Sequence, residues 1–425
     1  MKPSGIEWIG DIPDDWKVRK ITTLLDNIGS GTTPPNNTDF YENGIIPWLN
    51  TGDLTDNYVD LIENKITEYA LNQYSALKIF PKDSVVIAMY GATIGKLGIL
   101  RESASTNQAC CVMQCNDNLY FKFLFYSLYG YREYILTLSY GSGQPNISQK
   151  IIKDLRLPTP PLKTQQRIAD YLDEKCGEID ATIAKQKESI EKLKAYKQSL
   201  ISETVTKGLD KSAPLKPSGI DYLGDIPSHW EIKKLKFVAN FNQNTLPEDT
   251  DGQFELKYID IGNVSSVDGI KEIQYFNFSN APSRARRIVK YGDIIVSTVR
   301  TYLRAITSIK EDYDNCICST GFAVITPKDN VQQDFVVYAI ENESFIAQII
   351  ANSQGISYPA INVSQLENLK LAFPSVKEQK EIVDFLKTKL LEIDLTINKK
   401  QNIIQKLDAY KKSLIFECIT GKHKI

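Results

Sequence analysis

The feature that most constrains this chain of 425 residues is an internal repeat. The segment 2–21, KPSGIEWIGDIPDDWKVRKI, returns as 216–235, KPSGIDYLGDIPSHWEIKKL, at an offset of 214 residues. The same offset relates 163–180, KTQQRIADYLDEKCGEID, to 377–394, KEQKEIVDFLKTKLLEID. Because similar sequences fold alike, the chain is predicted to be a tandem duplication with two similar halves.

Between the repeated segments the two halves have diverged. Residues 48–53, WLNTGD, align with 258–263, YIDIGN, at an offset of 210, and Asp83 aligns with Asp293. A few loop residues have therefore been lost and regained, and only a skeleton of the sequence is shared. Similar ends indicate shared partners, whereas divergent middles indicate different ligands.

Each diverged region is predicted to form an α+β domain. Residues 1–158 combine apolar runs, such as 85–89, with turn signals such as Gly-Ser-Gly, Pro-Pro and Asn-Gly. The second half repeats this pattern, and a buried strand is expected at 293–299. Such alternation is typical of strands, and we expect accompanying helices at 121–138 and 333–350.

Each half ends in a segment that is typical of a long helix. After Pro161 and again after Pro374 the chain is almost free of glycine and proline until Gly208 and Gly421. Apolar residues recur in alternating steps of four and three, and seven of nine such positions are apolar in both segments. This period indicates a coiled coil of about 43 residues per helix, roughly 64 Å long.

Polar residues interrupt the apolar stripe at matching positions of the two helices. Gln186 corresponds to Lys400, and Lys197 corresponds to Lys411. Buried polar residues at such positions fix the register of a coiled coil, and this favours pairing of the two helices over two separate surface helices. The predicted organisation is an α+β domain at 1–158, a helix at 159–210, a second α+β domain at 211–373 and a second helix at 374–425.

Composition excludes several classes of protein. Hydrophobic residues at 42% and charged residues at 24% are typical of a globular protein. No apolar run approaches the roughly 18–20 residues that span a membrane, and the amino terminus lacks an apolar signal region, so we expect a cytoplasmic protein without membrane contact. The net charge of −2 means that any nucleic-acid contact must come from local basic patches.

Metal binding is not predicted. The seven cysteines show no C-x-x-C spacing, and only two histidines, His229 and His423, are available as further ligands. We expect the cysteines to be reduced and mostly buried, because a zinc site would need thiolates from scattered places.

The chain resembles the specificity subunits of type I restriction-modification systems over its whole length. The resemblance rests on two variable domains, each opened by P-S-G-I-x-x-x-G-D-I-P-x-x-W and closed by a long helix. Gln165 and Gln379 match the glutamine that opens each family helix. The glutamate that commonly precedes it is kept as Glu378 but replaced by Thr164, and 141–148, GSGQPNIS, resembles the family's polar loop before the closing strand.

This resemblance implies a function in DNA recognition without catalysis. The two variable domains would be target recognition domains for double-stranded DNA, and the two long helices would pack antiparallel as a spacer. Two methyltransferase subunits would dock on this frame, and restriction/translocase subunits could join them. S-adenosylmethionine, ATP and Mg²⁺ would belong to those partners. Two divergent domains imply an asymmetric, bipartite target.

The sequence lacks the catalytic motifs of the rival enzyme classes. Residues 91–97, GATIGKL, have three spacer residues where a phosphate-binding loop needs four and lack its Ser or Thr. Residues 33–36, TPPN, are a turn rather than an adenine-methyltransferase motif. A metal-dependent nuclease is the less favoured alternative. Its site would need clustered carboxylates with a lysine, which Glu248, Asp249, Glu255 and Lys257 roughly imitate. These residues have no counterpart in the first half. A coiled-coil scaffold is the other alternative, but it leaves two divergent domains unexplained.

In the second half, DNA contacts are predicted at the most basic window of the chain. Its cations, accompanied by the single acid Asp293, are Arg284, Arg286, Arg287, Lys290, Arg300 and Arg304. Arg300 and Arg304 follow the strand 294–299 and are predicted to read base edges, because the guanidinium fork matches guanine. Arg286 and Arg287 are assigned to phosphates. A solvated basic face is the alternative interpretation.

In the first half, the predicted DNA contacts follow the corresponding strand. Tyr90, Thr93 and Lys96 come after the apolar run 85–89. The polar loops supply second candidates in both halves, and these are Gln144, Asn146, Ser357 and Tyr358.

Overall fold

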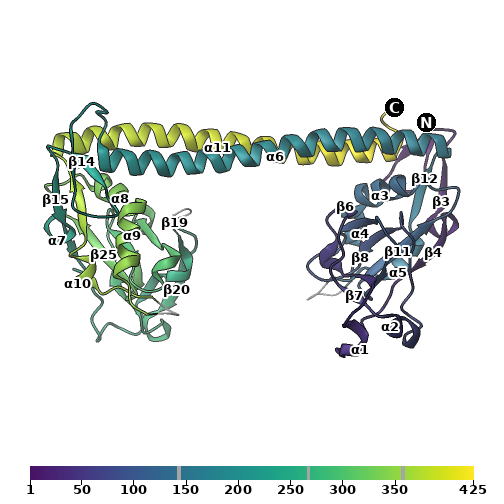
Figure 1. The fold of residues 1–425 in the computed structure, drawn as a ribbon, viewed down its shortest axis with the longest axis horizontal. Coiled ribbons are helices and arrows are strands. Elements are labelled where there is room, and N and C mark those ends of the chain that lie inside the picture. Colours follow the sequence, from purple (N-terminus) through teal and green to yellow (C-terminus); the bar gives the residue numbers. More distant parts are fainter. Residues whose placement is uncertain (141–144, 266–268, 356–358) are drawn as a thin grey trace. The chain divides into compact units, whose positions relative to one another are not determined.

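The computed structural model describes residues 1–140, 145–265, 269–355 and 359–425, which form two compact units (Figure 1). The first unit comprises residues 1–187 and 401–425, and the second comprises residues 188–400. Each unit therefore contains one α+β domain, a stretch of the first long helix and a stretch of the second.

The first domain is built on two sheets. Its main sheet has the order β4-β11-β8-β9-β6, antiparallel except for the parallel pair β6 and β9, and a smaller sheet has the order β10-β5-β7. The strands are β4 (Leu25–Gly29), β5 (Ile46–Leu49), β6 (Asn57–Val59), β7 (Lys65–Ile66), β8 (Val85–Ala88), β9 (Leu97–Leu100), β10 (Ser105–Thr106) and β11 (Cys110–Cys115).

The second domain repeats this plan. Its sheets have the orders β16-β25-β22-β23 and β20-β17-β24-β21. The strands are β16 (Ala239–Phe241), β17 (Glu255–Ile259), β20 (Gln274–Asn277), β21 (Ala285–Ile288), β22 (Ile294–Ser297), β23 (Ile306–Ser308), β24 (Ile317–Ser319) and β25 (Phe322–Pro327). A separate hairpin consists of β18 (Val264–Ser265) and β19 (Gly269–Ile270).

The central strand of each main sheet is buried on both faces, which explains its continuous apolar sequence. Successive side chains of a strand point to opposite faces. In β8, Val85 and Ile87 pack in one core cluster, whereas Val86 and Ala88 pack in another. In β22 the same alternation places Ile295 on the face opposite to its neighbours.

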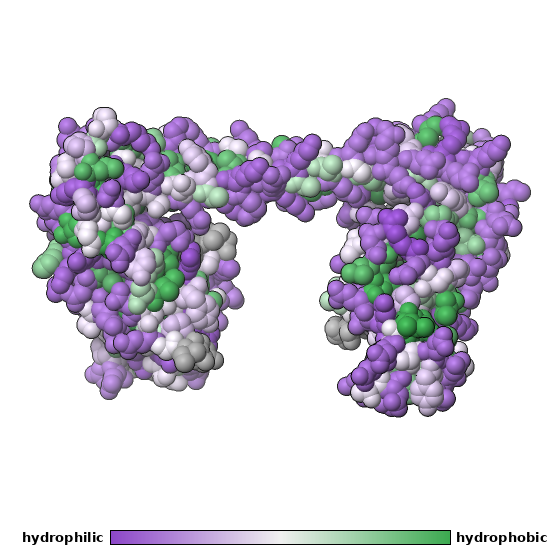
Figure 2. All heavy atoms as spheres, viewed as in Figure 1, coloured by the Kyte–Doolittle hydropathy of each residue, from purple (hydrophilic) through white to green (hydrophobic). Residues whose placement is uncertain are grey.

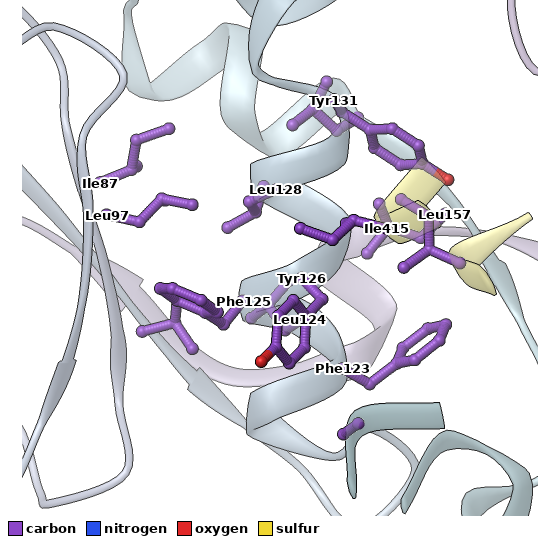
Figure 3. Packing of buried hydrophobic residues seen from close by; sticks show 14 of the residues in the cluster. Ile87, Leu97, Phe123, Leu124, Phe125, Tyr126, Leu128, Tyr131, Leu157 and Ile415 are labelled. Atoms are coloured by element: carbon purple, nitrogen blue, oxygen red, sulfur yellow. The ribbon is translucent and has the colours of Figure 1, made fainter. Parts of the chain in front are cut away.

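Helices cover one face of each main sheet. In the first domain α3 lies between the sheet residues Ile87 and Leu97 on one side and Leu157 and Ile415 on the other (Figure 3). The helices of the first domain are α1 (Thr38–Tyr41), α2 (Glu68–Gln73), α3 (Phe121–Gly130), α4 (Arg132–Thr137) and α5 (Gln149–Asp154). Those of the second are α7 (Leu235–Val238), α8 (Gln333–Glu341), α9 (Glu343–Asn352) and α10 (Val363–Leu366).

The helices expected at 121–138 and 333–350 are each divided into two. The first break follows Gly130, where an added Cβ would lie 2.6 Å from Ile419 Cδ1, so this position packs closely against a long helix. At the second break Asn342 has an extended backbone and its side chain accepts hydrogen bonds from the Ser344 and Phe345 amides. Asparagine thereby ends α8 and caps α9, as is usual for this residue type.

Short strand pairs join the ends of each domain. The repeated opening element forms β1 (Lys2–Pro3) with β2 (Asp11–Ile12), and β13 (Leu215–Pro217) with β14 (Asp225–Pro227). The closing strand pairs with the strand after this element in both halves, as β12 (Arg156–Thr159) with β3 (Lys17–Lys20), and β26 (Lys370–Phe373) with β15 (Glu231–Lys234).

The two long helices are α6 (Leu162–Lys207), with 46 residues, and α11 (Val376–Ile419), with 44 residues. Equivalent ion pairs join them in the two units. Lys411 Nζ lies 2.6 Å from Asp180 in the first unit, and Lys197 Nζ lies 2.7 Å from Asp394 in the second. The helices therefore run antiparallel in each unit, and lysines predicted to fix their register connect them. Hydrophilic side chains cover most of their visible surface (Figure 2).

Each domain core is completed by the end of the long helix that arises from the other half. In the first unit Ile415 and Ile419 belong to the same buried cluster as Trp16. Gly421, two residues after the end of α11, has a φ of +73°, and a Cβ there would clash with Pro13. In the second unit Gly208 ends α6 in the same left-handed conformation. Glycine suits both positions because it has no side chain to oppose this backbone.

A buried glutamine attaches the start of each long helix to its domain. Gln165, which is fully buried, accepts a hydrogen bond from the Tyr120 amide and donates to the carbonyls of Asn118 and Pro160. Gln379 accepts from the Gln332 amide and donates to the carbonyl of Pro374. A glutamine at the same position of the repeat thus hydrogen-bonds a buried main-chain carbonyl in both halves.

Gln165→Leu should destabilise the first unit by about 2–4 kcal/mol, because it removes the partner of the Tyr120 amide and of the carbonyls of Asn118 and Pro160, the last of which is buried. Urea unfolding measures this loss, and hydrogen exchange of the Tyr120 amide locates it. Gln149→Leu is the matched control, since it removes one half-buried hydrogen bond, to Ser30, and should cost about 0.5–1.5 kcal/mol. Unchanged exchange at Tyr120 in Gln165→Leu would contradict this account.

A buried carboxyl group lies beside one of the lysines that join the long helices. Glu341, in α8, lies near Lys197, and its counterpart in the first unit is Tyr129, whose ring lies 5.7 Å from Lys411 Nζ. Burial raises the pKa of Glu341 to about 7, although Lys197 opposes the shift. Since the pKa is higher in the folded protein than in the unfolded chain, folding takes up a proton. The resulting stabilisation is complete below about pH 4.5 and is lost as the pH rises through 7.

Glu341→Gln should therefore unfold at a higher urea concentration than the wild type at pH 8, and the difference should shrink as the pH falls to 5. The neutral amide removes the cost of burying a charge. Glu255→Gln, which removes an exposed carboxylate from the same unit, should leave the pH dependence unchanged. Parallel pH profiles for Glu341→Gln and the wild type would show that this carboxyl titrates normally.

In the part of the chain that the structure describes, no helix is both long and apolar enough to cross a membrane. No group of three or more side chains there could hold a metal ion. The seven cysteines are unpaired and six of them are buried. Burial raises the pKa of the Cys111 thiol to about 12.

Candidate nucleic-acid interface

The loop that follows the central strand has the same surroundings in both domains. Loop 89–96 connects β8 to β9, and loop 298–305 connects β22 to β23. Tyr90 forms a β-bridge with Asn146, and Val299 forms one with Ala360. Each loop is thereby fixed to the polar loop that precedes the closing strand. We call loops 89–96 and 298–305 the hairpin loops.

Main-chain hydrogen bonds confirm that the two hairpin loops are equivalent. Ile147 N donates to Met89 O over 2.7 Å, and Ile361 N donates to Thr298 O over 2.9 Å. At the other end, Ala88 N and Ser297 N donate to Lys96 O and Ala305 O, each over 2.9 Å. These contacts involve no side chains, so the loop can be kept while its side chains change.

In the first domain, the structure brings Tyr90 and Asn146 together, as the bridge between them shows. Thr93 is half-buried in the same loop, and Lys96 is exposed where the loop returns to β9. The Lys96 amide donates to Thr93 O over 2.9 Å. Gln144 lies outside the described residues.

In the second domain, Arg300 and Arg304 flank one turn of 3-10 helix, Thr301–Leu303. Arg300 is exposed, whereas Arg304 is half-buried and forms a 2.6 Å ion pair with Glu343. Thr301 is buried, and its hydroxyl lies 2.9 Å from that of Ser353. Ser357 and Tyr358 lie outside the described residues.

The remaining predicted cations lie on or beside strand β21 of the other sheet. Arg284 is exposed, and its carbonyl accepts a hydrogen bond from Thr320 N over 2.8 Å. The carbonyl of Gly321, the residue after Thr320, accepts a hydrogen bond from Thr298 N over 2.8 Å. A single turn therefore places Arg284 near the hairpin loop of the second domain.

Three of these cations are engaged within the fold. The Arg286 guanidinium lies 4.5 Å from the centre of the Phe278 ring and donates to the carbonyl of Ala285. Arg287 is half-buried, burial lowers its pKa, and its Nε is buried without a partner. Lys290 Nζ bonds to Asn315. The basic window is therefore not one uniform solvated patch.

Sequence reasoning missed two exposed side chains between the arginines, Tyr302 and Leu303. Contiguous exposed apolar surface can mark an interaction site, and these two neighbours lie together between the two arginines. Their signal was present in the sequence as T-Y-L between the two arginines, but only the turn shows that these residues project rather than pack.

Comparison with known proteins agrees with this architecture. A family model of the type I restriction modification DNA specificity domain matches residues 13–194 and, a second time, residues 227–406. The chain belongs to this family. The type I restriction enzyme MjaVIII specificity subunit of Methanocaldococcus jannaschii is 24% identical over 424 residues, covering 97% of this chain and 94% of that protein. The EcoBI specificity subunit of Escherichia coli is 24% identical over 360 residues, covering 81% and 74%.

Solved structures share the fold of this specificity subunit. The HsdS subunit from Thermoanaerobacter tengcongensis has a TM-score of 0.55 and 15% identity, covering 97% of this chain and 98% of that chain. A chain from work on complex assembly and conformational transition of the type I R-M system has a TM-score of 0.72 and 14% identity, covering 97% and 100%.

Arg284→Ala and Arg286→Ala should both weaken DNA binding by about the same factor for every sequence, if these residues contact phosphates. The dependence of log K on log salt should become shallower by about one for each. Only Arg286→Ala should also lower stability, by about 0.5–1 kcal/mol, because it removes the contact with Phe278. Binding titrations at several salt concentrations, paired with thermal melts, separate the two effects. A sequence-dependent loss would instead mark a base contact.

Proposed function

We propose that this chain is the non-catalytic subunit that gives a type I restriction-modification complex its DNA specificity, and that its target is bipartite and asymmetric. The observation that carries the proposal is the pair of hairpin loops, which share their main-chain contacts and differ in their side chains. Tyr90 and Gly91 of the first loop correspond to Val299 and Arg300 of the second. Two different sets of side chains on the same frame would read two different half-sites of double-stranded DNA.

The repeated ends support two equivalent docking surfaces for methyltransferase subunits. Both units present the opening element, the buried glutamine and the lysine–aspartate pair of the long helices in the same form. A complex with two methyltransferase subunits follows from this duplication, and restriction/translocase subunits would join it. S-adenosylmethionine, ATP and Mg²⁺ would then be bound by those partners.

The surroundings of residues 91–97 support the absence of nucleotide chemistry on this chain. A phosphate-binding loop connects a strand to the N-terminus of a helix, where main-chain amides hold the phosphates. Here the loop connects β8 to β9, two antiparallel strands. We therefore assign it to DNA recognition rather than to ATP binding.

Co-expression with the methyltransferase partner, followed by methylation-sensitive sequencing of the cellular DNA, tests the proposal. We expect one methylated motif made of two unlike half-sites, and a purified complex whose mass fits two methyltransferase subunits per chain. A perfectly palindromic motif, or a mass that fits one methyltransferase, would contradict the corresponding part of the proposal.

The length of the gap between half-sites should depend on the long helices. Insertion of one heptad after Lys187 and another after Lys400 keeps both lysine–aspartate pairs and adds about 10.5 Å of helix. At 3.4 Å per base pair, this should lengthen the gap by about three base pairs and leave the half-sites unchanged. A heptad after Lys187 alone is the control, because it mismatches the paired helices and should destabilise them. An unchanged gap in a stable double-insertion variant would contradict the role of the long helices in setting the distance between half-sites.

A further inference from the structure

The turn in the middle of the second hairpin loop exposes two large side chains. Tyr302 and Leu303 are 53% and 46% exposed, and both belong to the single 3-10 turn of this loop. In the first hairpin loop the corresponding residues are Thr93 and Ile94, and Ile94 packs against the core of its domain. The second loop therefore presents apolar surface at a position where the first loop packs it inward.

Contacts beneath the turn hold it in place. The Thr301 amide donates to the carbonyl of Pro359 over 3.3 Å, and the Thr301 hydroxyl lies 2.9 Å from that of Ser353. Within the turn, the Leu303 amide donates to the carbonyl of Arg300 over 2.9 Å. Thr301 is buried, so the turn is anchored through this residue while the next two residues face solvent. An anchored turn loses little conformational freedom on binding, which favours a specific contact.

Positive charge borders this apolar surface. Arg300 and Arg304 flank the turn in the sequence, and Arg284, which is exposed, lies near the same loop. Glu343 balances the charge of Arg304 through their ion pair. Apolar side chains bordered by cations are suited to a polyanion that also displays apolar groups, and double-stranded DNA has both properties.

The major groove of DNA offers one apolar group among its hydrogen-bonding atoms, the C5-methyl of thymine. An apolar side chain that covered the hydrogen-bonding atoms would deprive them of water without replacing it, which costs free energy. A wholly apolar side chain that enters the groove is therefore matched by thymine. Leu303 meets this condition, whereas the ring of Tyr302 carries a hydroxyl that needs a polar partner when it is buried.

We infer that Leu303 contacts the C5-methyl of a thymine in the half-site read by the second domain, and that it thereby selects an A·T pair at that position. This inference rests on the proposed function. The first domain has Ile94 at the corresponding place, packed against its own core, so it reads its half-site with other side chains.

Replacement of single thymines by deoxyuridine tests this contact, because it removes the methyl group and keeps the base pair. The complete complex with its methyltransferase partner is titrated with duplexes in which each thymine of the motif is replaced in turn. Wild-type binding should weaken by about three- to tenfold at one thymine, as expected for the loss of one buried methyl group. In Leu303→Ala the same replacement should change binding by less than about twofold, because the methyl group no longer has its partner.

Phe237→Ala is the matched control. Phe237 is 63% exposed and has a cation beside it, since Lys236 Nζ lies 5.6 Å from the centre of its ring, but it belongs to α7 and not to the hairpin loop. This variant should keep the wild-type difference between thymine and deoxyuridine. Since Leu303 is exposed, Leu303→Ala should melt within about 2 °C of the wild type, so that lost discrimination does not reflect unfolding.

The outcomes separate this inference from the proposed function. A wild-type complex that methylates no defined motif would overturn the proposed function, whatever the variants do. A defined motif in which no deoxyuridine weakens binding, or in which Leu303→Ala leaves that weakening unchanged, would overturn only the inference. Loss of the difference in Tyr302→Ala alone would also overturn it. Release of the methyltransferase from the Leu303→Ala complex would identify a protein contact instead, with the same consequence.

Discussion

The structure depends on a single packing constraint, in which each domain core is completed by a helix that begins in the other half of the chain. Ile415 and Ile419 are buried with Trp16 in the first unit, and Val205 is buried with Trp230 in the second. Part of the apolar surface of each half is therefore buried by the other, and the hydrophobic effect favours their association. This constraint explains why the opening elements and the helices remain alike while the domain interiors and loops differ.

Polar groups in these packed regions make the pairing specific. The lysine–aspartate pairs are only partly buried, so their net contribution to stability is small, but a register shift would strand a lysine against apolar neighbours. The buried glutamines Gln165 and Gln379 act in the same way at the helix starts, because each hydrogen-bonds main-chain groups there through both its amide oxygen and its amide nitrogen. The hydrophobic seam supplies attraction, and the polar residues select one arrangement.

Much of this architecture could be predicted from the sequence, because its signals are local or periodic. The repeat, the long helices and the buried central strands depend on spacing along the chain. The close packing of Gly130 against Ile419 could not be predicted, since the two residues lie far apart in the sequence. The surroundings of Arg286 and Arg287 could not be predicted either, because charge counting does not show that Arg286 packs on Phe278 or that Arg287 is half-buried.

The hairpin loops show how a duplicated fold can acquire two specificities. Their conformation is maintained by main-chain bonds, to Met89 in one domain and Thr298 in the other, so side chains can change without loss of the loop. Replacement is still not free of cost, because a left-handed position favours glycine over arginine. Arg300 and Arg304 nevertheless occupy such positions in the second domain. Backbone conformation thus distinguishes Arg300 from the many surface arginines that composition alone would treat as equal.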